Sequence, residues 1–231
     1  MKTLLASLLL LLPVAVLAQE PPKPQHKLIQ FQMAILKRGP KWSANLAKDA
    51  PALQKEQVDY VQSLLSSEKA AIVGQIKDES DLVGVYILRT ESADEAKKWL
   101  DSDPAIAAGH FVAELHPWWA EDVMTKTTTP NQLSTVYLAF LVKGEKWTAE
   151  ETPQTEELQK VHMANINRLA EMKKLEVAGP FGDDGFLRGI FVFKVNSLEE
   201  ARSLTMTDPA VQAGRFKLDI HPWLVPDGIL P

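Results

Sequence analysis

The chain matches itself without a gap when it is shifted by 105 positions, which places Lys41-Trp42 on Lys146-Trp147. The match covers residues 31–118 and 136–223, so one fold unit is encoded twice. The coinciding residues are mostly glycine, proline, tryptophan and helix-capping residues, which have specific backbone or packing roles. They include Gly74 and Gly179, Asp103-Pro104-Ala105 and Asp208-Pro209-Ala210, and His116-Pro117-Trp118 and His221-Pro222-Trp223. The differences between the two copies then indicate where function lies.

The first 18 residues have the pattern of a secretory signal peptide. Lys2 supplies a positive charge, residues 4–17 are almost entirely apolar, and Val16-Leu17-Ala18 offers small residues for cleavage. The apolar run is shorter than the ~20 residues of a membrane-spanning helix, although a retained membrane anchor is the alternative. The chain has no cysteine, which excludes disulfides and thiol lipidation. We expect cleavage near Ala18, no stable membrane anchor afterwards, and a secreted or bacterial periplasmic location.

Composition predicts how the rest of the chain is divided. Residues 19–30 begin with several prolines and are predicted to form a flexible leader, and the polar segment 119–135 is predicted to be a linker. The repeats then occupy residues 31–118 and 136–231. A net charge of −5 without a long charge run argues against nucleic-acid binding. Units of this size are near the lower limit for independent domains, so we expect them to pair within the chain.

The spacing of apolar residues predicts the same order of elements in both repeats. Residues 31–36 and 136–142 are typical of first strands, and residues 158–172 have the three- and four-residue spacing of an amphipathic helix. Strands are predicted at 70–76 and 84–88, and at 175–181 and 189–195. A last strand runs to each His-Pro-Trp.

Capping signals place the second helix of each repeat. Ser92 with Glu95, and Ser197 with Glu200, have the spacing of capping boxes. We interpret Asp103 and Asp208, each before a proline, mainly as N-caps of a short helical turn. The order is therefore β-α-β-β-α-β, a ferredoxin-like α+β unit. Because its bare sheet face must be covered, we predict that the two repeats pack as an intramolecular pseudo-dimeric α/β barrel.

The second repeat carries four short motifs in order along the chain. They are His162-Met163-Ala164-Asn165-Ile166, Ala178-Gly179-Pro180-Phe181, Asp208-Pro209-Ala210-Val211-Gln212-Ala213-Gly214 and Pro222-Trp223. With these motifs the repeat resembles the YCII-related family. The resemblance implies a dimeric α/β barrel, formed here within one chain, and a cleft where a helix histidine pairs with an acid. Related barrels host lyases, isomerases and monooxygenases, and fold alone does not choose between them.

The two copies differ where this chemistry would lie. His162 falls on Gln57, and Pro180-Phe181 falls on Gln75-Ile76. The first repeat therefore lacks the side chain that titrates near neutral pH. A single active cleft would belong to the second repeat, and the first would be a structural partner or a binding half.

His162 is the candidate general base, and the sequence does not decide which carboxylate pairs with it. Asp183 and Glu171 are the catalytic candidates, with Asp184 also near in sequence. Glu171 lies nine residues after His162, about half a turn out of phase on a helix. Asp183 is matched by Asp78, which suits a turn role as well as catalysis. The alternative is a buried histidine that is bonded only to backbone.

Other residues are assigned to binding or to structure. Pro180 and Phe181 are predicted to shape an apolar wall, and Trp147 either covers a ligand cleft or packs on the sheet edge. We interpret His116 and His221, which occur in both copies, as structural.

Recognised metal, phosphate and nucleophile motifs are absent from the sequence, so we expect no metal and no cofactor. Two functions remain open. The first is binding of a small organic molecule in a barrel cleft, and the second is cofactor-free acid/base catalysis of lyase or isomerase type by His162. The sequence does not determine a higher oligomeric state.

Overall fold

The computed structural model describes residues 27–125 and 129–231, so the predicted signal peptide lies outside the described residues. The first repeat contains β1 (Leu28–Arg38), α1 (Leu46–Asp49), α2 (Pro51–Ser66), β2 (Ala70–Ile76), β3 (Leu82–Leu88), α3 (Ala93–Asp101), α4 (Pro104–Ala107) and β4 (Phe111–Glu121). The second contains β5 (Thr129–Lys143), α5 (Pro153–Glu171), β6 (Leu175–Pro180), β7 (Leu187–Phe193), α6 (Leu198–Thr205), α7 (Pro209–Gln212) and β8 (Phe216–Asp227).

Both predicted connecting segments are shorter than composition indicated. Residues 28–30 of the predicted leader belong to β1, and Leu28 pairs with Glu121 of β4. Residues 119–121 and 129–135 of the predicted linker belong to β4 and β5, and Thr129 pairs with Asp227 of β8. The prediction failed here because backbone pairing with a long neighbouring strand extends a strand through residues of polar composition.

The strands form one antiparallel eight-stranded sheet in the order β4-β1-β3-β2-β8-β5-β7-β6. The repeats join where β2 pairs with β8, and the Lys77 amide donates to the Pro222 carbonyl at 3.0 Å. The two outer strands also meet, because the Gly182 amide donates to the Pro117 carbonyl at 2.8 Å. These two seams are equivalent by the 105-residue shift. The predicted pseudo-dimeric α/β barrel is thus confirmed as a nearly closed barrel.

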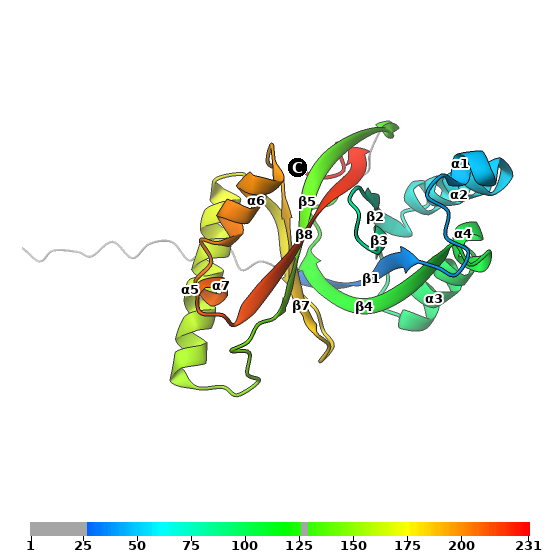
Figure 1. Cartoon of the computed structure of the whole chain (residues 1–231). Helices are drawn as coiled ribbons and strands as arrows, with labels where there is room; N and C mark the ends of the chain where they lie inside the picture. Colours follow the sequence, from blue (N-terminus) through cyan, green and yellow to red (C-terminus); the bar gives the residue numbers. More distant parts are fainter. Residues whose placement is uncertain (1–26, 126–128) are drawn as a thin grey trace, which may run out of the picture.

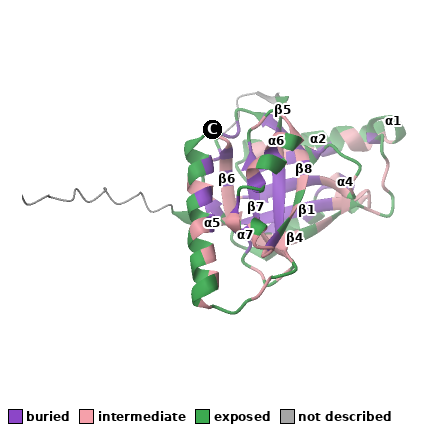
Figure 2. Ribbon diagram, turned by 60° about the vertical axis from the view of Figure 1, so that its left-hand side comes forward, coloured by how far each residue is buried: buried purple, intermediate pink, exposed green. Residues whose placement is uncertain are grey.

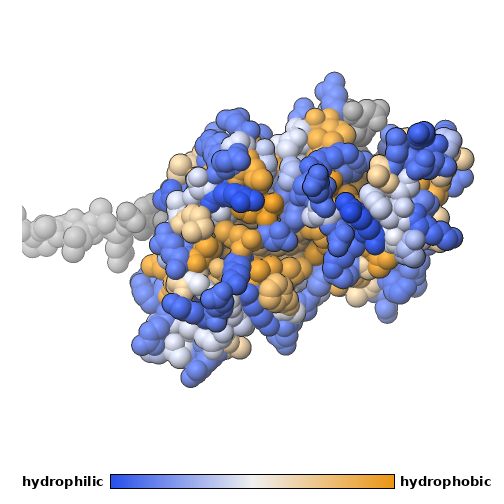
Figure 3. All heavy atoms as spheres, in the orientation of Figure 1, coloured by the Kyte–Doolittle hydropathy of each residue, from blue (hydrophilic) through white to orange (hydrophobic). Residues whose placement is uncertain are grey.

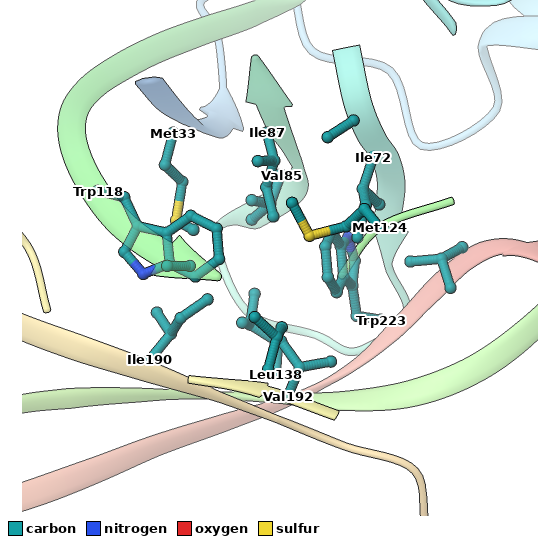
Figure 4. Packing of buried hydrophobic residues seen from close by; sticks show 14 of the residues in the cluster. Met33, Ile72, Val85, Ile87, Trp118, Met124, Leu138, Ile190, Val192 and Trp223 are labelled. Atoms are coloured by element: carbon teal, nitrogen blue, oxygen red, sulfur yellow. The ribbon is translucent and has the colours of Figure 1, made fainter. Parts of the chain in front are cut away.

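The helices lie outside the barrel, on opposite sides for the two repeats (Figure 1). A central core fills the barrel with side chains from both repeats, including Met33, Ile87, Leu138 and Val192 (Figure 4). Each repeat also has a core of its own, which lies between its half of the sheet and its helices. Figure 2 shows buried residues along the strands and exposed residues on the outer side of α5. The barrel interior is therefore a packed core.

Tryptophan and glycine fit together at each seam, which explains why both repeats carry them. Trp118 and Trp223 are fully buried, and the Trp118 indole donates to the Gly179 carbonyl at 3.1 Å. A Cβ atom on Gly179 would lie 1.8 Å from the Trp119 carbonyl oxygen, and one on Gly74 would lie 2.2 Å from Trp223 Nε1. Only glycine leaves room for the opposite repeat at these positions.

The serine caps form as predicted, but the glutamates do not complete the boxes. Ser92 and Ser197 accept the amides of Glu95 and Glu200, respectively. The Glu95 carboxylate instead accepts from the Thr90 hydroxyl, and that of Glu200 accepts from the backbone N–H of Asn196. In both boxes the carboxylate therefore accepts from a residue that precedes the serine.

Figure 3 shows hydrophilic residues over most of one face, with hydrophobic residues gathered across its middle. In the described residues, no helix is both long and apolar enough to span a membrane.

Candidate functional site

His162 pairs with Asp208, between α5 and the outer face of the sheet. The distance from His162 Nδ1 to Asp208 Oδ2 is 2.7 Å. The other oxygen, Oδ1, accepts the Ala210 amide at 2.8 Å, so Asp208 is also the predicted N-cap of α7. His162 is 7% exposed and Asp208 is fully buried. A carboxylate held in this way fixes the orientation of the imidazole.

Aromatic rings enclose the His162–Asp208 pair. The His162 ring stacks on Phe191 at 6.0 Å and lies 5.5 Å from Phe216. Asn165, which follows His162 on the same face of α5, places its amide nitrogen 3.5 Å from Asp208 Oδ2. Within the described part of the chain, His162 Nε2 makes no hydrogen bond. With Nδ1 donating to Asp208, this nitrogen is the one that could accept a proton.

Neither predicted carboxylate is the partner of His162. Asp183 Oδ2 lies 2.7 Å from Nδ1 of His116 in the other repeat, because the turn after β6 folds over β4. Glu171 is exposed at the last position of α5, as its helical phase indicated. Interpreting Asp208 mainly as an N-cap hid its second role. A cap needs one carboxylate oxygen, so the other was available to α5.

The predicted binding residues are divided between two places. Phe181 is 3% exposed and belongs to the barrel core, and Pro180 is exposed at the end of β6. They therefore do not form a wall beside His162. Trp147 does lie close by, with its ring 5.7 Å from Phe216.

In the first repeat, Asp103 bonds to uncharged side chains in place of a histidine. Gln57 Nε2 donates to Asp103 Oδ2 at 2.9 Å and to the Tyr86 hydroxyl at 2.8 Å. The Tyr86 hydroxyl also donates to Asp103, at 3.1 Å. Burial raises the pKa of Asp103, against the effect of the hydrogen bonds from Gln57, Tyr86 and two backbone amides. Phe191 occupies the equivalent of Tyr86, so the second repeat cannot form the same network.

Two further histidine–aspartate pairs cross the seams, and we call them the seam clasps. They are His116–Asp183 and His221–Asp78, each with Nδ1 2.7 Å from a carboxylate oxygen. Burial acts to raise the pKa of each aspartate. At Asp78, the hydrogen bonds from Ser80 and His221 outweigh the effect of burial. At Asp183, the hydrogen bonds from His116 and the Gly185 amide do the same. The pKa of each aspartate is therefore lowered. His116 and His221 thus link the two repeats, which agrees with the structural role that we expect for them.

The seam clasps predict a specific loss of stability in acid. A lowered folded-state pKa stabilises the fold above the unfolded value of 3.8, and this stability is lost as pH falls through the folded pKa. Each clasp is partly exposed and contributes about 1 kcal/mol or less. In urea unfolding at pH 7 and pH 3, Asp78→Asn/Asp183→Asn should lose less stability on acidification than wild type. Asp101→Asn, at an exposed ion pair, is the control. An unchanged acid response in the double variant would refute the role of the clasps.

A cleft of about 600 Å³ lies in the first repeat, between α2 and the outer face of the sheet. We call it the first-repeat cleft. The sequence assigned any single active cleft to the second repeat and left the first repeat as a structural partner or a binding half, and a cleft in the first repeat agrees with the binding half. Two residues of β8, Leu224 and Pro226, help to line it. The other lining residues include Leu36, Arg38, Trp42, Gln57, Val58, Val61, Val73, Val83, Tyr86, His110 and Phe111.

Metal ligands are not clustered in the described ranges, where no group of three or more His, Asp or Glu side chains could hold an ion.

The fold and the paired repeats define a dimeric α/β barrel built within one chain. The model of the YCII-related domain matches residues 33–118 and 135–224, and the chain therefore belongs to the YCII-related family. A curated relative is the uncharacterized protein YjpA of Bacillus subtilis (strain 168). It is 36% identical over 76 residues, covering 31% of this chain and 87% of YjpA.

Solved structures show the same fold at low sequence identity. A heme-binding protein from Thermus thermophilus is 13% identical, with a TM-score of 0.50 over 90% of this chain and 94% of its own. A mutant chlorite dismutase from Candidatus Nitrospira defluvii is 12% identical, with a TM-score of 0.55 over 87% and 92%. These likenesses concern the fold alone.

Proposed function

We propose that this protein binds a small, mainly apolar organic molecule in the first-repeat cleft, and that it does so outside the cytoplasm after export. The volume of about 600 Å³ carries the proposal, since ligand sites usually measure about 300–1,000 Å³. The signal-peptide pattern of residues 1–18 supports the location.

The lining of the cleft favours an apolar or aromatic ligand. Gln57 and Tyr86 line the cleft and are already satisfied by hydrogen bonds to each other and to Asp103, so they require no polar partner from a ligand. Trp42, Val61 and other apolar side chains form much of the remaining surface. A flat or cyclic molecule could cover this surface and exclude water from it.

A thermal-shift screen of uncharged cyclic and aromatic compounds tests the proposal. Hemin, which is charged, is tested separately because a protein of the same fold binds heme. A ligand at 100 times its Kd should add about 2.7 kcal/mol of stability. Val61→Trp should abolish this gain by filling the cleft. Val112→Trp is the matched control, because Val112 is 48% exposed on β4 and does not line the cleft. Stabilisation that persists unchanged in Val61→Trp would refute binding in this cleft.

The His162–Asp208 pair favours a second function, acid/base catalysis of lyase or isomerase type without a cofactor. His162 would accept a proton at Nε2, and Asp208 would orient the ring and stabilise the charge formed. In this chemistry the proton moves between a carbon acid and the imidazole, and aromatic neighbours limit the access of water. Loss of such a base lowers turnover by about 10²- to 10⁴-fold.

A further inference from the structure

Three cationic side chains surround Trp147 on the outer side of the second repeat. The guanidinium carbons of Arg215 and Arg188 lie 4.4 and 4.9 Å from the indole centroid, and Lys143 Nζ lies 5.7 Å from it. Lys143 ends β5, Arg188 is on β7, and Arg215 immediately precedes β8. Three neighbouring strands thus bring positive charge to one ring.

These cations are not neutralised by carboxylates. Lys143 Nζ donates to the Asp184 carbonyl at 3.0 Å, and Arg188 Nη1 donates to the Asp183 carbonyl at 2.9 Å. Both acceptors are backbone oxygens, and across residues 27–125 and 129–231 none of the three cations forms an ion pair with a carboxylate side chain. The Asp183 side chain is within electrostatic range of Arg188 but is bonded to His116 and the Gly185 amide.

The two guanidinium groups also carry signs of unmet interaction. Arg188 Nε is buried and has no hydrogen-bond partner among the described residues. Burial and the positive charge of Arg188 lower the pKa of Arg215. Two like charges are therefore held close together, and a negative group between them would relieve their repulsion.

The first repeat does not have this cluster. The equivalents of Lys143, Arg188 and Arg215 are Arg38, Val83 and His110, which all line the first-repeat cleft. Arg38 alone lies over the equivalent tryptophan, at 5.5 Å. The second repeat therefore places two guanidinium groups where the first has an apolar side chain and a histidine.

We propose that Arg188, Arg215 and Lys143 bind an oxyanion, the carboxylate or phosphate group of a small organic molecule, beside Trp147. Guanidinium groups suit this ligand because their N–H donors match two oxygens at once. Nε of Arg188 supplies a donor that now has no acceptor.

The oxyanion site is next to the candidate base. Phe216 lies 5.7 Å from Trp147, 5.5 Å from His162 and 6.0 Å from the Arg215 guanidinium carbon. If His162 is catalytic, its substrate is then an organic anion. The oxyanion site itself depends neither on that catalysis nor on ligand binding in the first-repeat cleft, so it can be tested separately.

The test is a titration of ¹⁵N-labelled protein with inorganic phosphate and, separately, with benzoate. The Arg188 Nε–H and Trp147 indole resonances should shift saturably, and the probe with the lower Kd identifies the preferred head group. Arg188→Gln and Arg215→Gln should each raise that Kd about tenfold or more. Lys97→Gln makes the same charge change at an exposed ion pair on α3 and should leave it unaltered.

Two results with the first set of variants would overturn the oxyanion site, and a third comes from Arg215→Lys. One is the absence of a saturable shift at both resonances with either probe up to about 10 mM, the range of a weak specific site. The other is equal weakening by Lys97→Gln, which would show an effect of bulk charge. If Arg188→Gln does not fold, Arg215→Lys is used instead. It keeps the positive charge but removes the paired N–H donors of the guanidinium group, so it should also raise the Kd. An unchanged Kd in Arg215→Lys would count against the site.

Discussion

Gly179→Ala is expected to destabilise the protein by about 3 kcal/mol, because the added methyl group meets backbone rather than a movable side chain. Its Cβ would lie 1.8 Å from the Trp119 carbonyl oxygen and 3.2 Å from Trp118 Nε1. Strand β4 must therefore move away from β6, which opens this seam of the barrel. Urea unfolding monitored by circular dichroism measures the loss of free energy.

Gly182→Ala is the control for this substitution. Its Cβ would lie 3.0 Å from Nε1 of Trp119, whose side chain is 38% exposed and can shift. The loss should be less than about 1 kcal/mol. Equal effects of Gly179→Ala and Gly182→Ala would mean that β4 and β6 do not meet as described.

Asp208→Ala is expected to cost about 3 kcal/mol or more, because Asp208 has two buried partners. His162 Nδ1 would lose its acceptor, and the Ala210 amide would lose the cap of α7. Asp101→Ala, at an exposed ion pair, should change the free energy of unfolding by less than about 0.5 kcal/mol. A small loss in Asp208→Ala would show that the buried pair is not formed in solution.

Variants of Asp208 also test whether His162 has the tautomer that a general base requires. In wild type, ¹⁵N chemical shifts should show neutral His162 protonated at Nδ1, with Nε2 free. Asp208→Asn has one oxygen for two donors. If that oxygen keeps the Ala210 amide, the NH₂ group faces His162 Nδ1, so we expect the wild-type tautomer to be lost in Asp208→Asn as well as in Asp208→Ala. A wild-type His162 protonated at Nε2 would remove the catalytic hypothesis.

The barrel could be predicted from the sequence because the same order of strands and helices is indicated independently in each repeat. Gly74 and Gly179 with Trp118 and Trp223 are complementary across the seams, and for that reason each copy carries both. The partner of His116 could not be predicted, since it depends on how β4 meets β6 when the two ends of the sheet approach. The match of Asp78 with Asp183 and of His116 with His221 was the available signal.

The candidate site was predicted only in part. His162 was recognised from its contrast with Gln57, but the choice of acid failed because Asp208 serves two partners at once. The size of the first-repeat cleft could not be predicted for a different reason. The volume of a cleft depends on the side chains that fill the space between a helix and the sheet, and a local pattern of apolar residues does not predict that volume.

The most direct test of ligand binding in the first-repeat cleft uses Trp42 and Trp147, which are equivalent in the two repeats. An uncharged compound from the thermal-shift screen would be titrated while both indole N–H resonances are followed by NMR. Trp42 lines the cleft, so its resonance should shift saturably while that of Trp147 stays in place. Saturable shifts at Trp147 with none at Trp42 would contradict binding in the first repeat.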